Sequence, residues 1–146
     1  MTPGKRTFRP LSSKEVCRAY ELLHERNLVS FPLNQDSANK IDALVSNITG
    51  TFYAREIYPS LEQKVVAYLY FIIKDHAFVD GNKRTAILVF KVLCELNDLK
   101  IKSDIALDSL AVFIEKINES DHQEVIRTLA DILFKSVMKE NGNVIK

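Results

Sequence analysis

Two stretches of the chain, residues 61–73 and 85–96, are apolar on almost every face of a helix. A helix of that kind must be surrounded by other elements of the same domain. The two stretches therefore predict an all-α domain with two buried helices at its centre. Between them lies a polar, glycine-containing loop, residues 76–84, and its position next to the core requires an explanation.

Helical spacing of apolar residues predicts four further helices, at about 12–26, 37–48, 103–118 and 120–139. Ser12 and Glu15 have the spacing of a helix-starting capping box. The segment 51–58 is rich in β-forming residues and predicts a short extended flap. We expect one domain over residues 1–146, with a flexible N-terminal arm (1–10) and a fraying tail (140–146).

Composition narrows the class of protein further. The 146 residues are 47% hydrophobic and carry a formal net charge of +1, so no overall field attracts nucleic acid or an anionic membrane. The longest apolar run, residues 65–73, is far shorter than the roughly 20 residues that span a bilayer. Cys17 and Cys94 lie in helical patterns and predict no disulfide. We expect a soluble cytoplasmic protein.

The residues of the polar loop suit a polyphosphate ligand. Asp80, Gly81, Asn82, Lys83 and Arg84 come just before a buried helix, whose first N–H groups lack partners within the helix. Glycine and asparagine tolerate the left-handed backbone that gathers N–H groups around an anion, and lysine and arginine add full charges. The carboxylate of Asp80 suits Mg²⁺, which proteins hold with one or two carboxylates plus substrate phosphates.

The other end of the loop supplies a proton acceptor. His76 is the loop side chain that can exchange a proton near neutral pH. Phe78 and Val79 are predicted to anchor the loop in the core. A base, a metal ligand and a phosphate site within one short stretch indicate phosphoryl or nucleotidyl transfer.

This loop resembles the signature of the Fic/Doc superfamily, in which His-Pro-Phe-x-Asp-Gly-Asn is followed by Gly or Lys and then Arg. The match covers His76, Phe78, Asp80, Gly81, Asn82, Lys83 and Arg84, and Ala77 replaces the usual proline. The resemblance implies that His76 deprotonates a hydroxyl of a target protein, that Asp80 holds Mg²⁺, and that residues 81–84 bind the phosphates of ATP. It also implies that the flap docks an extended target segment by strand addition, through Phe52, Tyr53, Ala54, Arg55, Glu56 and Ile57. An ordinary connecting hairpin is the alternative for the flap.

Two departures from the signature bear on the transferred group. Relatives that transfer AMP have Gly after the Asn and a second Arg three residues beyond the first, whereas this chain has Lys83 and Ile87. Both departures resemble the death-on-curing branch, whose founding member transfers the γ-phosphate to a threonine of elongation factor Tu. The resemblance therefore favours phosphoryl transfer from ATP, and a toxin of a toxin–antitoxin pair. AMP transfer is the alternative.

The C-terminal helix carries a pattern that some AMP-transferring relatives use for self-inhibition. Ser136, Glu140 and Asn141 match a Ser/Thr-x-x-x-Glu-Gly/Asn inhibitory helix. In those relatives the glutamate pairs with the second arginine, whose place Ile87 takes here. We therefore favour a chance match and expect inhibition, if any, from a separate antitoxin.

Other classes of function fit less well. A non-catalytic helical binding module is an alternative that would not need both His76 and Asp80. A P-loop is excluded because Lys83 lacks a glycine five residues upstream. Zinc chemistry is opposed by three dispersed histidines and two separate cysteines, and DNA binding by the near-zero charge.

Overall fold

The structure is a computed structural model that describes residues 7–102, 105–118 and 120–142, with the backbone alone from 135 onward. Across these residues the chain forms six helices and one two-stranded hairpin, which confirms the predicted all-α fold with a small β flap. The elements in chain order are α1 (Ser13–Glu25), α2 (Gln35–Ile48), β1 (Thr51–Phe52), β2 (Arg55–Glu56), α3 (Leu61–Lys74), α4 (Asn82–Leu96), α5 (Leu107–Lys116) and α6 (His122–Gly142).

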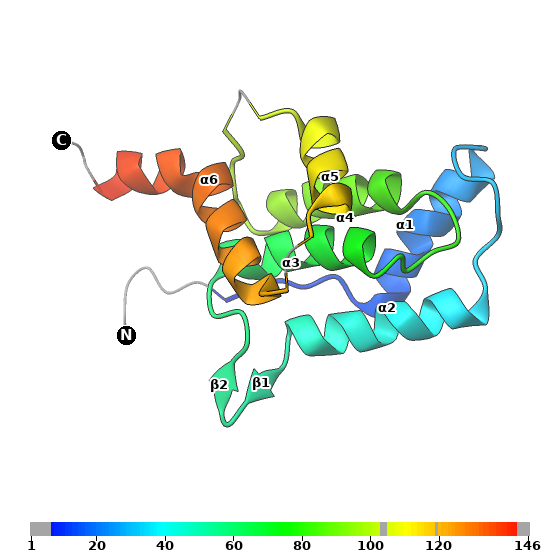
Figure 1. Ribbon diagram of the computed structural model, residues 1–146, viewed down its shortest axis with the longest axis horizontal. Coiled ribbons are helices and arrows are strands. Elements are labelled where there is room, and N and C mark those ends of the chain that lie inside the picture. The colour runs from blue at the N-terminus through cyan, green and yellow to red at the C-terminus, as the bar shows by residue number, and fades with distance from the viewer. Residues whose placement is uncertain (1–6, 103–104, 119, 143–146) are drawn as a thin grey trace.

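The two central helices are those that the apolar stretches predicted. Helix α3 packs against α2, α4, α5 and α6, and α4 also contacts α1 and α5 (Figure 1). Residues 65–70 of α3 are wholly buried, as are Val89, Phe90 and Leu93 of α4. Because α3 is covered on all sides, its two ends are held in fixed positions. The hairpin precedes one end of α3, and the signature loop follows the other.

Side-chain caps explain where several helices begin. The Ser12 hydroxyl accepts a hydrogen bond from the N–H of Glu15, and the Glu15 carboxylate accepts one from the N–H of Ser12, as the capping box predicted. Helix α2 begins at Gln35, earlier than expected, because the Asn34 side chain accepts from the N–H of Ser37 at 2.7 Å.

Three other helix boundaries differ from the prediction. Helix α4 begins at Asn82 rather than Thr85, so residues 82–84 form its first turn instead of the loop before it. Helix α5 begins at Leu107, not 103. Helix α6 continues through Gly142, beyond the predicted end near Lys139 and into the tail predicted at 140–146, of which residues 143–146 lie outside the described part of the chain.

The hairpin turns through two residues without the help of glycine. Thr51 pairs with Glu56 and Phe52 with Arg55, and the turn residues Tyr53 and Ala54 both have positive φ, 53° and 65°. That is the backbone of a type I′ turn, which usually contains Asn or Gly because a β-carbon disfavours it. The aromatic rings of Phe52 and Tyr53 lie 4.4 Å apart and are largely exposed.

The contacts of the N-terminal segment with the core begin nearer to residue 1 than the sequence predicted. The main chain of Arg9 exchanges two hydrogen bonds with the side chain of Asn97, and the Phe8 ring lies 6.4 Å from that of Tyr68. The ring of Phe8 and the main chain of Arg9 therefore contact the core within the predicted flexible arm, whereas the side chains of Arg9 and Pro10 are exposed. Among the helices of the described residues, none has the length and apolar character needed to cross a membrane.

Candidate active site

The signature loop joins the end of α3 to the start of α4. Asp75 caps α3, Gly81 precedes α4, and His76 lies just after the cap with its side chain exposed. The backbone of His76 has φ 47°, a left-handed conformation that is uncommon for a residue with a β-carbon. Its N–H donates to the carbonyl of Ile73 at 3.2 Å, so the backbone is held while the imidazole faces solvent.

One aromatic side chain anchors the loop. Phe78 is buried and stacks on Tyr20 of α1, with ring centroids 4.3 Å apart and planes 8° apart. Ala77, in the place of the usual proline, is also buried. Val79 is 61% exposed, so the prediction that it anchors the loop is wrong. The inward position at this turn is taken by Phe78.

Asn82 closes the loop upon itself. Its side-chain amide donates to the carbonyl of Phe78 and its side-chain oxygen accepts from the N–H of Phe78, both at 2.8 Å. Both polar atoms of the side chain are therefore used inside the loop. The backbone N–H of Asn82 and the second N–H of its side-chain amide are left to serve the phosphate-binding role that the resemblance implies.

Asp80 is held as a carboxylate. The N–H of Ser30 donates to its Oδ2 at 3.1 Å. This bond lowers the pKa of Asp80, and the N–H of Gly81, the Ser30 hydroxyl and the charge of Arg84 act in the same direction against a smaller desolvation effect. An ionised, half-buried carboxylate of this kind suits a hard cation.

The two cations of the first turn of α4 have different partners. Arg84 is exposed and donates from Nη1 to the carbonyl of Leu28 at 3.0 Å. Lys83 pairs with Glu115 of α5 at 3.0 Å, and both side chains are about two-fifths exposed, at 41% and 38%. A solvated pair of this kind is weak, so Lys83 can exchange Glu115 for a phosphate at little cost.

A segment that the sequence did not single out lies against the loop: residues 28–31, in the connection from α1 to α2. Its backbone contacts Asp80 and Arg84, and Tyr20 donates to the carbonyl of Phe31 at 2.6 Å. Val29 is buried against Gly81, where an added β-carbon would meet its Cγ1 at 2.2 Å. Three of these four residues are apolar, but their spacing in the sequence does not indicate that Val29 is the buried one while Leu28 and Phe31 are exposed.

The start of α4 is open to an anion. Gly81 has φ 76° and provides no side-chain cap, so the first N–H groups of a 15-residue buried helix have no cap from that residue. Within the described residues, no group of three or more His, Cys, Asp or Glu side chains could hold a metal ion. The single carboxylate of Asp80 fits Mg²⁺ that arrives with a nucleotide, since phosphate and water can supply the remaining ligands.

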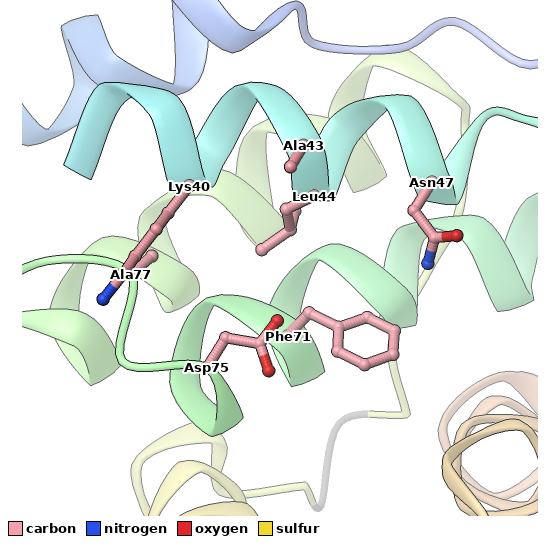
Figure 2. Close-up of a pocket in the computed structure, with 7 residues that line it drawn as sticks. All are labelled: Lys40, Ala43, Leu44, Asn47, Phe71, Asp75 and Ala77. Atoms are coloured by element: carbon pink, nitrogen blue, oxygen red, sulfur yellow. The ribbon is translucent and has the colours of Figure 1, made fainter. Parts of the chain in front are cut away.

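A shallow hollow runs between α2 and α3 beside the loop. Figure 2 shows it with Lys40 and Asn47 extending from α2 and Phe71 and Asp75 from α3, and it has a volume of about 390 Å³. Desolvation raises the pKa of Asp75, against the opposing effect of nearby cationic groups. The carboxyl group of Asp75, which lines this hollow, belongs to the residue that precedes His76 in the chain.

A second hollow, of about 500 Å³, leads from the first toward the hairpin. It shares Asn47 and Phe71 with the first, and Phe52, Ile57 and His122 also line it. Together the two hollows connect the hairpin to the loop along α3. Helix α6 includes the predicted inhibitory residues Ser136, Glu140 and Asn141, but the structure describes only their backbone, not their side chains.

An all-α domain with a loop of this composition between its two central helices is a Fic-type domain. The sequence matches the Fic/DOC family over residues 10–94, more than half of the chain, and the protein belongs to that family. It is also 31% identical over 81 residues to the protein named Toxin Doc of Mycolicibacterium smegmatis, an alignment that covers 56% of this chain and 62% of that relative. The chain thus spans less than two thirds of the relative that it matches. No solved structure gives a significant match.

Proposed function

We propose that this protein is a transferase that moves the γ-phosphoryl group of ATP onto a hydroxyl of another protein. The observation that carries the proposal is the composition of one loop. It exposes His76, holds Asp80 as a carboxylate and opens onto the uncapped start of α4. A proton acceptor, a cation ligand and an anion site are the three parts that phosphoryl transfer requires.

In the proposed reaction His76 takes the proton of the acceptor hydroxyl. The acceptor oxygen forms a bond to the γ-phosphorus, the bond from that phosphorus to the β–γ bridging oxygen breaks, and ADP leaves. The N–H groups at the start of α4, with Arg84, would hold the phosphates, and Asp80 would hold Mg²⁺, which supplies charge neutralisation when bound. Arg84 must exchange the carbonyl of Leu28 for phosphate oxygen.

AMP transfer is the second candidate for the same site. There the acceptor oxygen would bond to the α-phosphorus and pyrophosphate would leave. Lys83 and Ile87, in place of Gly and Arg, favour phosphoryl transfer, and so does the similarity to a protein named Toxin Doc. An inhibitory helix at Ser136 and Glu140 would instead favour AMP transfer, but we favour a chance match for that pattern because Ile87 replaces the arginine that the glutamate pairs with. We further propose that a separate antitoxin protein restrains the enzyme, and that the enzyme acts in the cytoplasm.

The hairpin would dock the acceptor protein. An extended segment paired with β1 or β2 could continue through the hollow beside His122 and then through the hollow between α2 and α3, and so reach His76. Helix α3 spans about 15 Å from Lys64 to Lys74 at roughly 1.5 Å per residue. About five extended residues cover that distance.

Labelled ATP tests the proposal. The protein is incubated with cell extract and ATP labelled on either the α- or the γ-phosphate, beside His76→Ala. Transfer of γ-label alone supports phosphorylation, and transfer of α-label replaces it with AMP transfer. Equal labelling by wild type and His76→Ala would remove the proposed base, and no transfer of either label by the wild type would refute the proposed activity.

A further inference from the structure

One charged side chain is buried at the junction of the hairpin and α3. The Lys64 side chain is 6% exposed, although lysine is rarely buried in proteins. Its ammonium group donates to the carboxylate of Glu56 in β2 and to the carbonyl of Tyr58, and it lies 6.0 Å from the centroid of the Phe8 ring. Lys64 thus joins α3, the hairpin and the N-terminal segment.

Burial of such a group is not explained by stability alone. Removing an ammonium ion from water is costly, and a buried ion pair often contributes no more than apolar residues of the same volume. What the pair can provide is a fixed geometry, because movement of the hairpin away from α3 would leave the buried ammonium group without its two hydrogen-bond partners. The arrangement here sets β2 against the first turn of α3.

The hairpin needs such a fixed point. It has two paired positions, its strands are exposed along their length, and its turn adopts an unfavourable backbone at Tyr53 and Ala54. An isolated hairpin of this size is marginal in water. At the base of the hairpin the N–H of Ile57 donates to the carbonyl of Gly50, so the bonds of Lys64 add a separate attachment to the core.

We propose that Lys64 is a positioning residue that fixes the hairpin as a docking edge at a set distance from His76. This inference rests on the proposed function, because the distance matters only if the hairpin binds the acceptor protein. Lys64 lies in the first turn of the buried helix α3, and His76 follows the end of the same helix. The helix acts as a rigid spacer between the docking edge and the proposed base.

The first test needs no substrate. Hydrogen exchange of the amides of residues 51–58 is measured for wild type, Lys64→Met, Glu56→Gln and a matched control, Lys74→Met. Lys74 is a second lysine of α3 that donates to a carbonyl, that of Ile117, away from the hairpin. Lys64→Met and Glu56→Gln should speed exchange in the hairpin about tenfold or more, with helix amides unchanged. Lys74→Met should leave hairpin exchange as in the wild type.

The second test separates docking from chemistry. Label transfer from ATP is measured over a dilution series of cell extract and, separately, over a series of ATP concentrations. For Lys64→Met and Glu56→Gln the half-saturating extract concentration should rise about tenfold, while the half-saturating ATP concentration stays within about twofold of the wild-type value. Lys64→Arg, which keeps the charge, should restore part of the loss.

Hydrogen exchange and label transfer together distinguish a wrong inference about Lys64 from a wrong proposed function. Unchanged hairpin exchange in both Lys64→Met and Glu56→Gln would overturn the inference. Faster hairpin exchange with an unchanged half-saturating extract concentration would also overturn it. An equal rise in the half-saturating concentrations of extract and of ATP would overturn it too, because that result indicates a general structural role for Lys64. If Lys64→Met fails to fold, Glu56→Gln carries the test, because Glu56 is about half exposed. Absence of transfer by the wild type would refute the proposed function, and the exchange data would still decide whether Lys64 holds the hairpin.

Discussion

Substituting Gly81 by alanine should destabilise the protein through two separate effects. The residue has φ 76°, a conformation that costs a residue with a β-carbon about 1 kcal/mol or somewhat more. The new β-carbon would also lie 2.2 Å from Cγ1 and 3.1 Å from Cβ of Val29, which is buried. Forcing extra volume into a packed site costs typically about 1–3 kcal/mol. We therefore expect a loss of about 2–4 kcal/mol, or about 4–16 °C in Tm for a chain of this size.

Urea unfolding of a double-mutant cycle separates the two effects. Val29→Ala removes the closest contact, so the Gly81→Ala/Val29→Ala protein should be more stable than the sum of the single variants predicts, by about 1 kcal/mol or more. The remaining loss then measures the backbone conformation alone. A loss below about 1 kcal/mol for Gly81→Ala, or additivity within about 0.5 kcal/mol, would refute the contact between the loop and residues 28–31.

Three further predictions concern the same loop. Tyr20→Phe keeps the stacking on Phe78 but removes the hydrogen bond to the carbonyl of Phe31. It should lower the free energy of unfolding in urea by about 1 kcal/mol and weaken Mg²⁺-ATP binding severalfold in calorimetry. Unchanged binding would contradict a role for residues 28–31 in holding the site. Asn82→Ala removes both bonds to Phe78 and should cost about 1–3 kcal/mol, whereas a cost near zero would show that the side chain is free in solution. For Asp80 the folded pKa is lowered, so its charge stabilises the fold above the ordinary aspartate pKa of about 4, and this contribution is lost as the pH falls through the lowered value. Thermal melts without metal or nucleotide should therefore show Asp80→Asn below wild type at pH 7 and close to it at acid pH, and a constant difference down to about pH 3 would contradict the assigned shift.

The helices could be predicted from the sequence because their signals are local. Apolar residues on almost every face identified α3 and α4 as the buried pair, and the Ser12–Glu15 box placed the start of α1. The start of α2 was missed because Asn34, three residues before Ser37, was not recognised as its cap. This error and those at the starts of α4 and α5 concern only the ends of helices.

The loop was predicted in composition but not in arrangement. Which residues gather there follows from their order in the chain, whereas their orientation depends on contacts made elsewhere. Asn82 turns inward because both of its polar atoms find partners on Phe78, and Val79 turns outward because Phe78 stacks on Tyr20. The main chain of residues 28–31 donates to Asp80 and accepts from Arg84, and main-chain bonds leave no pattern of side chains to detect.

The buried lysine was missed for a related reason. In the sequence Lys64 occupies the first turn of a helix, a position where an exposed charge is ordinary. Only the packing of the hairpin over that turn shows that the charge is enclosed.

Titration of the isotope-labelled protein with Mg²⁺-ATP, followed by the backbone amide resonances, tests the central claim most directly. If the start of α4 binds the phosphates, the amides of residues 80–84 should shift first and furthest, and the shifts should be lost in Asp80→Ala. Shifts confined to other surfaces, such as the two hollows along α3, with residues 80–84 unmoved at saturating nucleotide, would contradict it.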